Sequence, residues 1–208
     1  MRKVSCVFAV ILLIIITNGC GKVDNEQSLH FFAGYEITND EIDYFKTELR
    51  TDVVNYFSEN YTITDYGTFW TDTFDGVTPT EYLETIALES AEKSKAELIV
   101  IKSYGIYEDI SFSGLKDDAE QYNREHEGVS GTVGLTSIDM TSFYSYYIAN
   151  GRLEAINIIL EQNPPTQAEI DLYRADNNIQ DEASDTAVAK KIAEEKYYEE
   201  VEKQGMAQ

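Results

Sequence analysis

The sequence predicts a mostly α-helical fold in a single domain. Long segments carry apolar residues at spacings of three and four, which is the period of an amphipathic helix. Three segments open with the Thr-x-x-Glu pattern of a helix capping box, at Thr38, Thr78 and Thr166. The length of 208 residues suits one domain with a core large enough to fold without disulfides.

The first nineteen residues are expected to form a secretory signal peptide. Arg2 and Lys3 precede an apolar run from Val4 to Ile16, which is shorter than the roughly 20 residues that span a bilayer. Cys20 follows Gly19 at the end of this region, which resembles a bacterial lipoprotein signal. In that family the Cys becomes the first mature residue and carries thioether-linked diacylglycerol. The alternatives are a transmembrane helix, which the length disfavours, and a cleaved signal with a coincidental cysteine.

Lipidation at Cys20 changes the chemistry of the mature chain. Cys6 lies in the removed segment, so neither a free thiol nor a disulfide remains. Two or more acyl chains give stable anchoring, at about 0.8 kcal/mol for each buried methylene. Loss of Arg2 and Lys3 leaves 14 basic and 38 acidic residues, a net charge of -24 in place of -22. Residues 20–29 are expected to form a tether.

Composition excludes several classes of protein. Such an acidic chain lacks the basic patches that neutralise phosphates, so we expect no nucleic-acid binding. Two cysteines cannot build a disulfide framework or a Cys-rich zinc site. A hydrophobic fraction of 43% argues against a wholly disordered acidic tail.

The first half of the mature chain is expected to contain a strand and two helices. Residues 31–37 read as a short strand kinked at Gly34. The capping box at Thr38 opens a helix whose apolar stripe is Ile42, Phe45, Leu49, Val53 and Tyr56. An aromatic-rich connection over residues 60–76 leads to a helix from Thr78 to about Tyr104, which Gly105 ends. Its predicted buried face is Leu83, Ala87, Ala91, Ser94, Leu98 and Ile101.

The second half is expected to contain four helices. A polar helix covers residues 113–127, and a loop with three glycines follows over 128–134. A long helix runs from about Ile138 to Glu161, and two prolines break the chain after Asn163. The capping box at Thr166 opens a short helix, and residues 176–185 form a polar linker. The last helix covers about 186–204, with Val188, Ile192, Tyr198 and Val201 on its apolar face.

The order of these segments resembles one family. The stretch from Gly34 to Glu41, the pair Phe69-Trp70 before residues 76–83, the helix end at Tyr104-Gly105-Ile106, and the helix start at 166–170 carry the likeness. Together they resemble the chaperone part of extracytoplasmic peptidyl-prolyl isomerase foldases of the SurA and PrsA type. Related helical folds occur in the trigger factor chaperone. The resemblance covers residues 30–204 and implies a helical chaperone-like domain with a short N-terminal strand.

One departure from that family limits the function that the resemblance implies. In the family, a parvulin isomerase domain usually follows the helix that Thr166 opens, and a terminal helix then packs back on the core. Here the interval over residues 176–185 is too short to hold a domain. The two histidines, His30 and His126, both lie in segments assigned to the chaperone part. The chaperone architecture therefore carries over, and the isomerase activity does not.

The candidate binding residues are aromatic. Large amphipathic rings give contact area at a low entropy cost, so these groups could line a cradle for unfolded chains. The competing interpretation is ordinary core packing. Neither histidine has a motif of a catalytic triad around it, and no acidic cluster has the spacing of a calcium loop, so we expect no catalytic residue, metal or cofactor. The candidates are Phe69, Trp70, Phe143, Tyr144, Tyr146 and Tyr147.

The expected function is that of a chaperone-like lipoprotein anchored to the cell membrane. It would bind unfolded or exported polypeptides on the extracytoplasmic side, without covalent chemistry. The alternatives are a peptidyl-prolyl cis-trans isomerase, as the family label suggests, and an envelope scaffold lipoprotein that binds one folded partner.

The lipid anchor gives a direct prediction. Cys20→Ser should release the protein from the membrane fraction and abolish incorporation of labelled palmitate, because the thiol that accepts the lipid is gone. Cell fractionation and fatty-acid labelling measure both effects. Cys6→Ser is the matched control and should change neither, since this residue lies in the leader. Membrane retention of the Cys20→Ser chain would contradict the assignment.

Overall fold

The computed structural model describes residues 30–126, 137–179 and 183–206, and within them the fold is mostly helical, as predicted. The expected signal peptide, tether and 128–134 loop lie outside these residues. In chain order the elements are β1 (His30–Phe32), β2 (Tyr35–Ile37), α1 (Asn39–Asn60), α2 (Pro79–Ser103), α3 (Phe112–His126), α4 (Met140–Gln162), α5 (Gln167–Asp176) and α6 (Asp185–Met206).

The predicted N-terminal strand is a hairpin of two strands. β1 and β2 pair antiparallel, with His30 opposite Ile37 and Phe32 opposite Tyr35. The residues between them, Ala33 and Gly34, both have a positive φ (48° and 82°), as in a type I′ turn. Gly34 therefore reverses the chain where the sequence suggested a kink within one strand.

All three predicted capping threonines begin helices. At the starts of α2 and α5 the box is complete, because the threonine and the third-residue glutamate each accept a hydrogen bond from the other's backbone N–H. At the start of α1, Thr38 Oγ1 accepts from the Glu41 N–H at 3.2 Å. The Glu41 side chain, however, is fully buried. This carboxylate therefore has a structural role that the capping pattern did not indicate.

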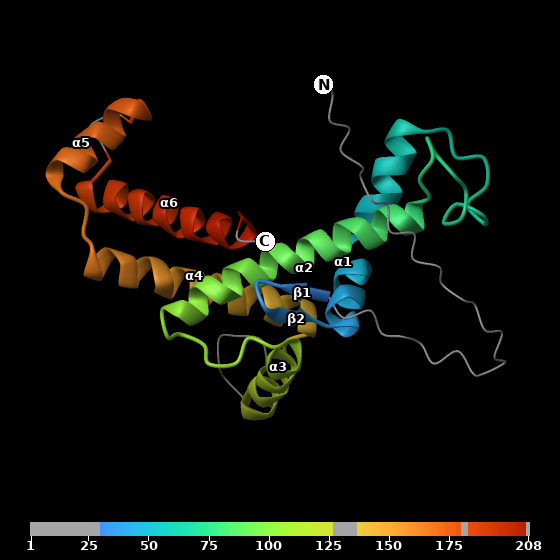
Figure 1. Ribbon diagram of the computed structural model, residues 1–208, viewed down its shortest axis with the longest axis horizontal. Coiled ribbons are helices and arrows are strands. Elements are labelled where there is room, and N and C mark those ends of the chain that lie inside the picture. Colours follow the sequence, from blue (N-terminus) through green and yellow to red (C-terminus); the bar gives the residue numbers. More distant parts are fainter. Residues whose placement is uncertain (1–29, 127–136, 180–182, 207–208) are drawn as a thin grey trace, which may run out of the picture.

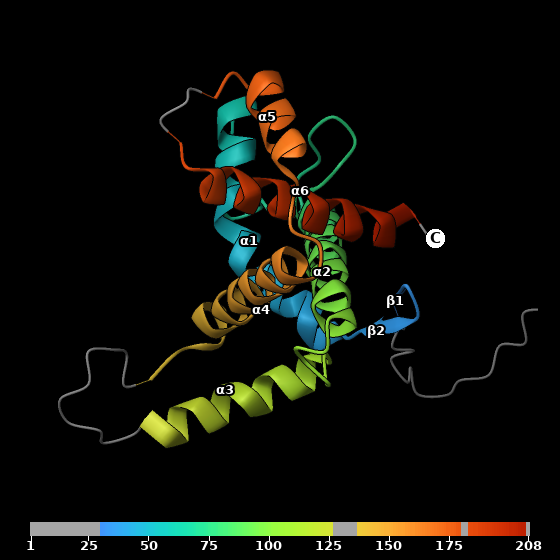
Figure 2. The same cartoon turned by 90° about the vertical axis from the view of Figure 1, so that its left-hand side faces the viewer.

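Helix α2 is the centre of the molecule. It contacts α1, α4, α6 and both strands, so most other elements are positioned against it. Figures 1 and 2 show α6 returning along α4 and across α2, so that the last helix closes the core. The terminal helix packs back on the core, as expected from the resemblance. α5 packs on the N-terminal part of α6 and stands away from the rest.

Two predicted apolar faces are displaced by one residue at their ends. On α1 the buried aromatic ring is Phe57, and Tyr56 is exposed. On α6 the buried ring is Tyr197, and Tyr198 is 38% exposed. In each pair, only one of the two adjacent rings faces the core. The sequence pattern fits either ring, because positions three and four residues apart both lie on the same face of a helix.

A buried ion pair joins α1 to α2. Lys95 Nζ lies 3.2 Å from Glu41 Oε2, and both side chains are almost completely shielded from solvent. Lys95 also donates to the Ile110 carbonyl at 3.2 Å, and the Tyr144 hydroxyl of α4 donates to Glu41 Oε1 at 3.2 Å. Burial raises the pKa of Glu41 by more than the charge of Lys95 lowers it. Three helices and the segment before α3 thus meet at one polar cluster.

Removing one member of this cluster should be costly. Lys95→Met leaves the Glu41 carboxylate buried without its counter-charge, so we expect the free energy of unfolding to fall by about 3–5 kcal/mol. The double variant Glu41→Leu/Lys95→Met should recover most of this loss, because a buried pair replaced by apolar side chains is often neutral. Urea denaturation followed by circular dichroism measures both. Equal losses in the single and double variants would contradict the coupling.

Candidate polypeptide-binding surface

The six predicted aromatic residues do not form one cradle. Phe69 and Trp70 lie at the far end of the α1–α2 pair, and the other four lie on α4. Phe69, Phe143, Tyr144 and Tyr147 are buried in the core. In this structure they have a packing role, and the prediction that they line an open surface needs correction. Trp70 is half-buried and Tyr146 is 51% exposed, so only these two of the six are accessible.

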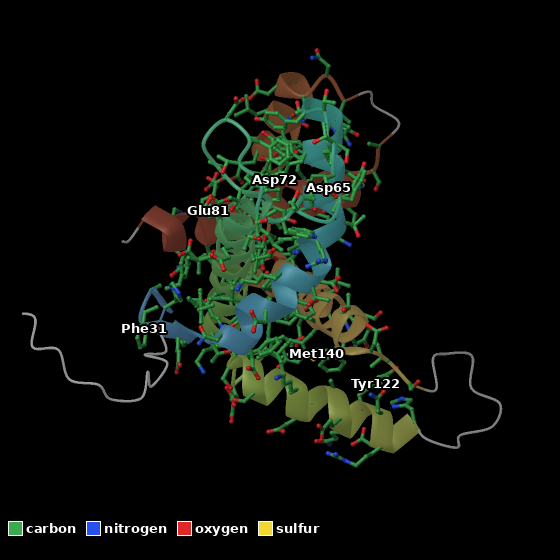
Figure 3. The ribbon with its side chains drawn as sticks, turned by 90° about the vertical axis from the view of Figure 1, so that its right-hand side faces the viewer. Phe31, Asp65, Asp72, Glu81, Tyr122 and Met140 are labelled. Carbon is green, nitrogen blue, oxygen red and sulfur yellow. The ribbon has the colours of Figure 1, made fainter. Side chains whose placement is uncertain are left out.

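A satellite aromatic core supports Trp70. Phe57 contacts the rings of Tyr61, Phe69 and Phe74 at centroid distances of 5.6, 6.0 and 5.2 Å. Figure 3 labels Asp65 and Asp72 in this connection, which joins the end of α1 to the start of α2. The Thr80 hydroxyl donates to the Trp70 carbonyl at 2.6 Å and fixes the connection to the first turn of α2. The backbone at Trp70 is therefore held in place.

A groove between α1 and α2 begins at Trp70. The Arg50 guanidinium lies 4.1 Å from the Trp70 ring centre, in a cation–π contact. Two hollows of about 590 and 480 Å³ adjoin here, and they share Asp43, Lys46 and Glu84. We call this surface the α1/α2 groove, and its apolar floor comes mainly from Ile42, Leu83, Leu88 and Trp70.

A second groove lies between α2 and α6. It has a volume of about 460 Å³ and begins on α2 one residue beyond the α1/α2 groove, at Glu89. We call it the α2/α6 groove. Its apolar members are Phe32, Ala96, Tyr198 and Val201, and its charged members are Glu89, Glu92, Lys93, Glu97 and Glu202.

The two grooves follow one another along a single helix. Their α2 residues run from Thr80 to Glu97, which at 1.5 Å per residue is a length of about 26 Å. The two grooves share no lining residue, and at 3.6 residues per turn Leu88 and Lys93 lie about 140° apart around α2, so each groove is a separate site. Strand β1 borders both grooves, since His30 lines the first and Phe32 the second.

A polar network holds the wall of the α2/α6 groove in position. Arg152 Nη2 lies 2.7 Å from Glu97 Oε2, and its guanidinium lies 5.6 Å from the Tyr198 ring centre. The Tyr197 hydroxyl donates to Glu97 at 3.2 Å. Burial and then the negative charge of Glu97 raise the pKa of Tyr197, so this hydroxyl stays protonated and keeps donating. Glu97 is thus occupied by groups of α4 and α6.

Among residues 30–126, 137–179 and 183–206, no group of three His, Cys, Asp or Glu side chains could hold a metal ion. No helix in these ranges is long and apolar enough to cross a membrane. His126 stacks on Tyr122 with ring centres 4.1 Å apart, and its Nδ1 lies 2.7 Å from the Tyr122 carbonyl oxygen. Two further hollows occur among the described residues, of about 330 Å³ beside Tyr104 and about 470 Å³ beside Arg174, and their linings are more polar than those of the two grooves.

Comparison with family models, curated proteins and solved structures finds no match to this chain. The resemblance to foldases of the SurA and PrsA type therefore remains a prediction. What the grooves can bind follows from their own side chains.

The contact between Arg50 and Trp70 can be tested with the chain's single tryptophan. Arg50→Ala should lower the free energy of unfolding by about 0.5–1 kcal/mol, the usual value of an exposed cation–π contact. It should also increase acrylamide quenching of Trp70 fluorescence, because the guanidinium covers one ring face. Arg124→Ala on α3 removes an equivalent charge away from Trp70 and should leave the quenching unchanged. Equal quenching in wild type and Arg50→Ala would contradict the contact.

Proposed function

We propose that the protein is a membrane-anchored, extracytoplasmic, chaperone-like lipoprotein that holds unfolded or exported polypeptides without covalent chemistry. The observation that carries this proposal is the pair of open grooves that follow one another along α2. Each groove combines apolar and charged side chains in its lining. Surfaces of this kind take the apolar side chains that folded proteins hide and unfolded proteins expose.

The grooves are held by rigid surroundings, which favours binding. The wall from α1 is fixed by the pair Glu41–Lys95, and the wall from α6 by the contacts of Glu97 with Arg152 and Tyr197. A preformed surface loses little conformational entropy when a ligand binds. Both grooves are also open to solvent along their length, so a bound segment can leave without a large rearrangement.

The lipid anchor and the charge fit the same role. A lipid at Cys20 would keep the protein at the membrane where exported chains emerge. The mature net charge of -24 would keep the folded body away from an anionic lipid surface.

A client-protection assay tests the proposal. The full-length chain in neutral detergent should reduce light scattering from an aggregating unfolded protein at stoichiometric amounts. Leu88→Ser removes an apolar group from the α1/α2 groove and should weaken the protection about tenfold or more, since burial of a leucine side chain contributes about 1.5–3 kcal/mol. Leu172→Ser is the matched control, because Leu172 is 62% exposed on α5 and lies outside both grooves.

Two further measurements separate the alternatives. A proline-peptide assay should show only the uncatalysed rate of isomerisation, and acceleration that a point mutation abolishes would favour an isomerase. Affinity capture from the native envelope should recover many clients in small amounts, and one stoichiometric folded partner would favour a scaffold. Wild-type protein that gives no protection to any client would overturn the proposal.

A further inference from the structure

We propose that the α2/α6 groove selects polypeptide segments that combine apolar side chains with lysine or arginine. This inference rests on the proposed function, because it names the class of segment that one of the two grooves would take. It follows from three features of the groove, which are its floor, its rim and its contrast with the α1/α2 groove.

The floor offers apolar surface next to solvent. Phe32 and Ala96 are core residues whose edges reach the groove, and Val201 is half-buried beside them. Tyr198 is 38% exposed, and the Arg152 guanidinium lies 5.6 Å from the centre of its ring. Phe31, the neighbour of Phe32 on β1, is 58% exposed and points outward at the edge of the hairpin (Figure 3). Apolar side chains of a ligand therefore have a place to bind.

The rim is acidic and its charges are available. Glu89, Glu92 and Glu202 form no ion pair within the described part of the chain. Glu97 is already engaged by Arg152, and Lys93 is the only basic residue that lines the groove among the residues described. Three unpaired carboxylates thus surround an apolar floor and favour a cationic ligand.

The α1/α2 groove has no such excess. Lys46 lies 3.3 Å from Asp43 and 3.8 Å from Glu84, so the charges there neutralise one another. Arg50 is stacked on Trp70. Selection by charge is therefore a property of the α2/α6 groove and not of the α1/α2 groove.

The same rim disfavours the other occupants of this groove. A second copy of the chain would bring another body of charge -24 against the three carboxylates. The chain's own segment from Gly21 to Leu29 contains Asp24 and Glu26 against the single basic residue Lys22. A separate polypeptide with basic and apolar residues is the occupant that complements the groove.

Peptide binding to the full-length chain in neutral detergent tests the inference. The probe is a fluorescent peptide of about twelve alternating leucine and lysine residues, which when extended is longer than the α2/α6 groove. The triple variant Glu89→Gln/Glu92→Gln/Glu202→Gln should bind it roughly tenfold more weakly at low salt, as expected for the loss of several exposed ion pairs. Added salt should reduce this difference through screening.

A matched variant separates local from general attraction. Glu59→Gln/Glu154→Gln/Glu161→Gln removes the same charge from exposed positions outside the groove and should leave the peptide affinity within about twofold of wild type. Equal weakening in both triple variants would overturn the inference, because it would mean attraction to the acidic body as a whole. Equal affinity for a leucine–glutamate peptide would overturn it as well.

Crosslinking locates the bound segment. A photoreactive phenylalanine analogue in place of Tyr198 should couple to the peptide. Coupling to the chain's own residues 21–29, or to a second copy, in place of the peptide would overturn the choice of occupant. If the wild-type protein protects a client but does not bind the peptide, the groove assignment is rejected and the proposed function stands. If the wild-type protein protects no client, the proposed function itself is rejected.

Discussion

The fold depends on one buried ion pair, between Glu41 and Lys95. Two charges without access to water can be tolerated only if each keeps its partner at close range, so the pair fixes the distance between α1 and α2. The Tyr144 hydroxyl donates a hydrogen bond to Glu41, and Lys95 donates one to the Ile110 carbonyl. These two bonds bring α4 and the segment before α3 to the same point. Such a cluster contributes little net stability, but it penalises other arrangements of the helices. The groove between α1 and α2 has its shape because this spacing is fixed.

Much of the fold could be predicted from local sequence patterns. The threonines at 38, 78 and 166 gave correct helix starts, and Gly105 follows the last turn of α2, because caps and stops act within a few residues. Glu41 shows the limit of this reasoning. The same Thr-x-x-Glu pattern occurs at all three starts, but only here does a lysine 54 positions further on face the glutamate inside the core. That choice depends on tertiary packing, which a capping pattern does not contain.

The candidate site was less predictable than the fold. A run of aromatic residues on α4 indicates burial or binding equally well, and which side chains face α1 and α2 decides between them. The α2/α6 groove has a weak local signal, since Glu89, Lys93 and Glu97 recur at intervals of four on one face of α2. Its other wall is Tyr198, Val201 and Glu202, about a hundred residues later in the chain. Only the return of α6 brings these walls together.

The position of α6 also determines the order in which the molecule can be completed. Val100 and Ile101 on α2 share a core cluster with Ala193 and Tyr197, so this part of the central helix is only partly covered until α6 has been synthesised. Contacts between such distant positions slow folding, and exposed apolar surface makes unfinished chains prone to aggregate. The newly made protein therefore passes through an incompletely folded stage in which apolar side chains of α2 are exposed to solvent. The α2/α6 groove exists only after α6 has docked on α2, whereas no α6 residue lines the α1/α2 groove.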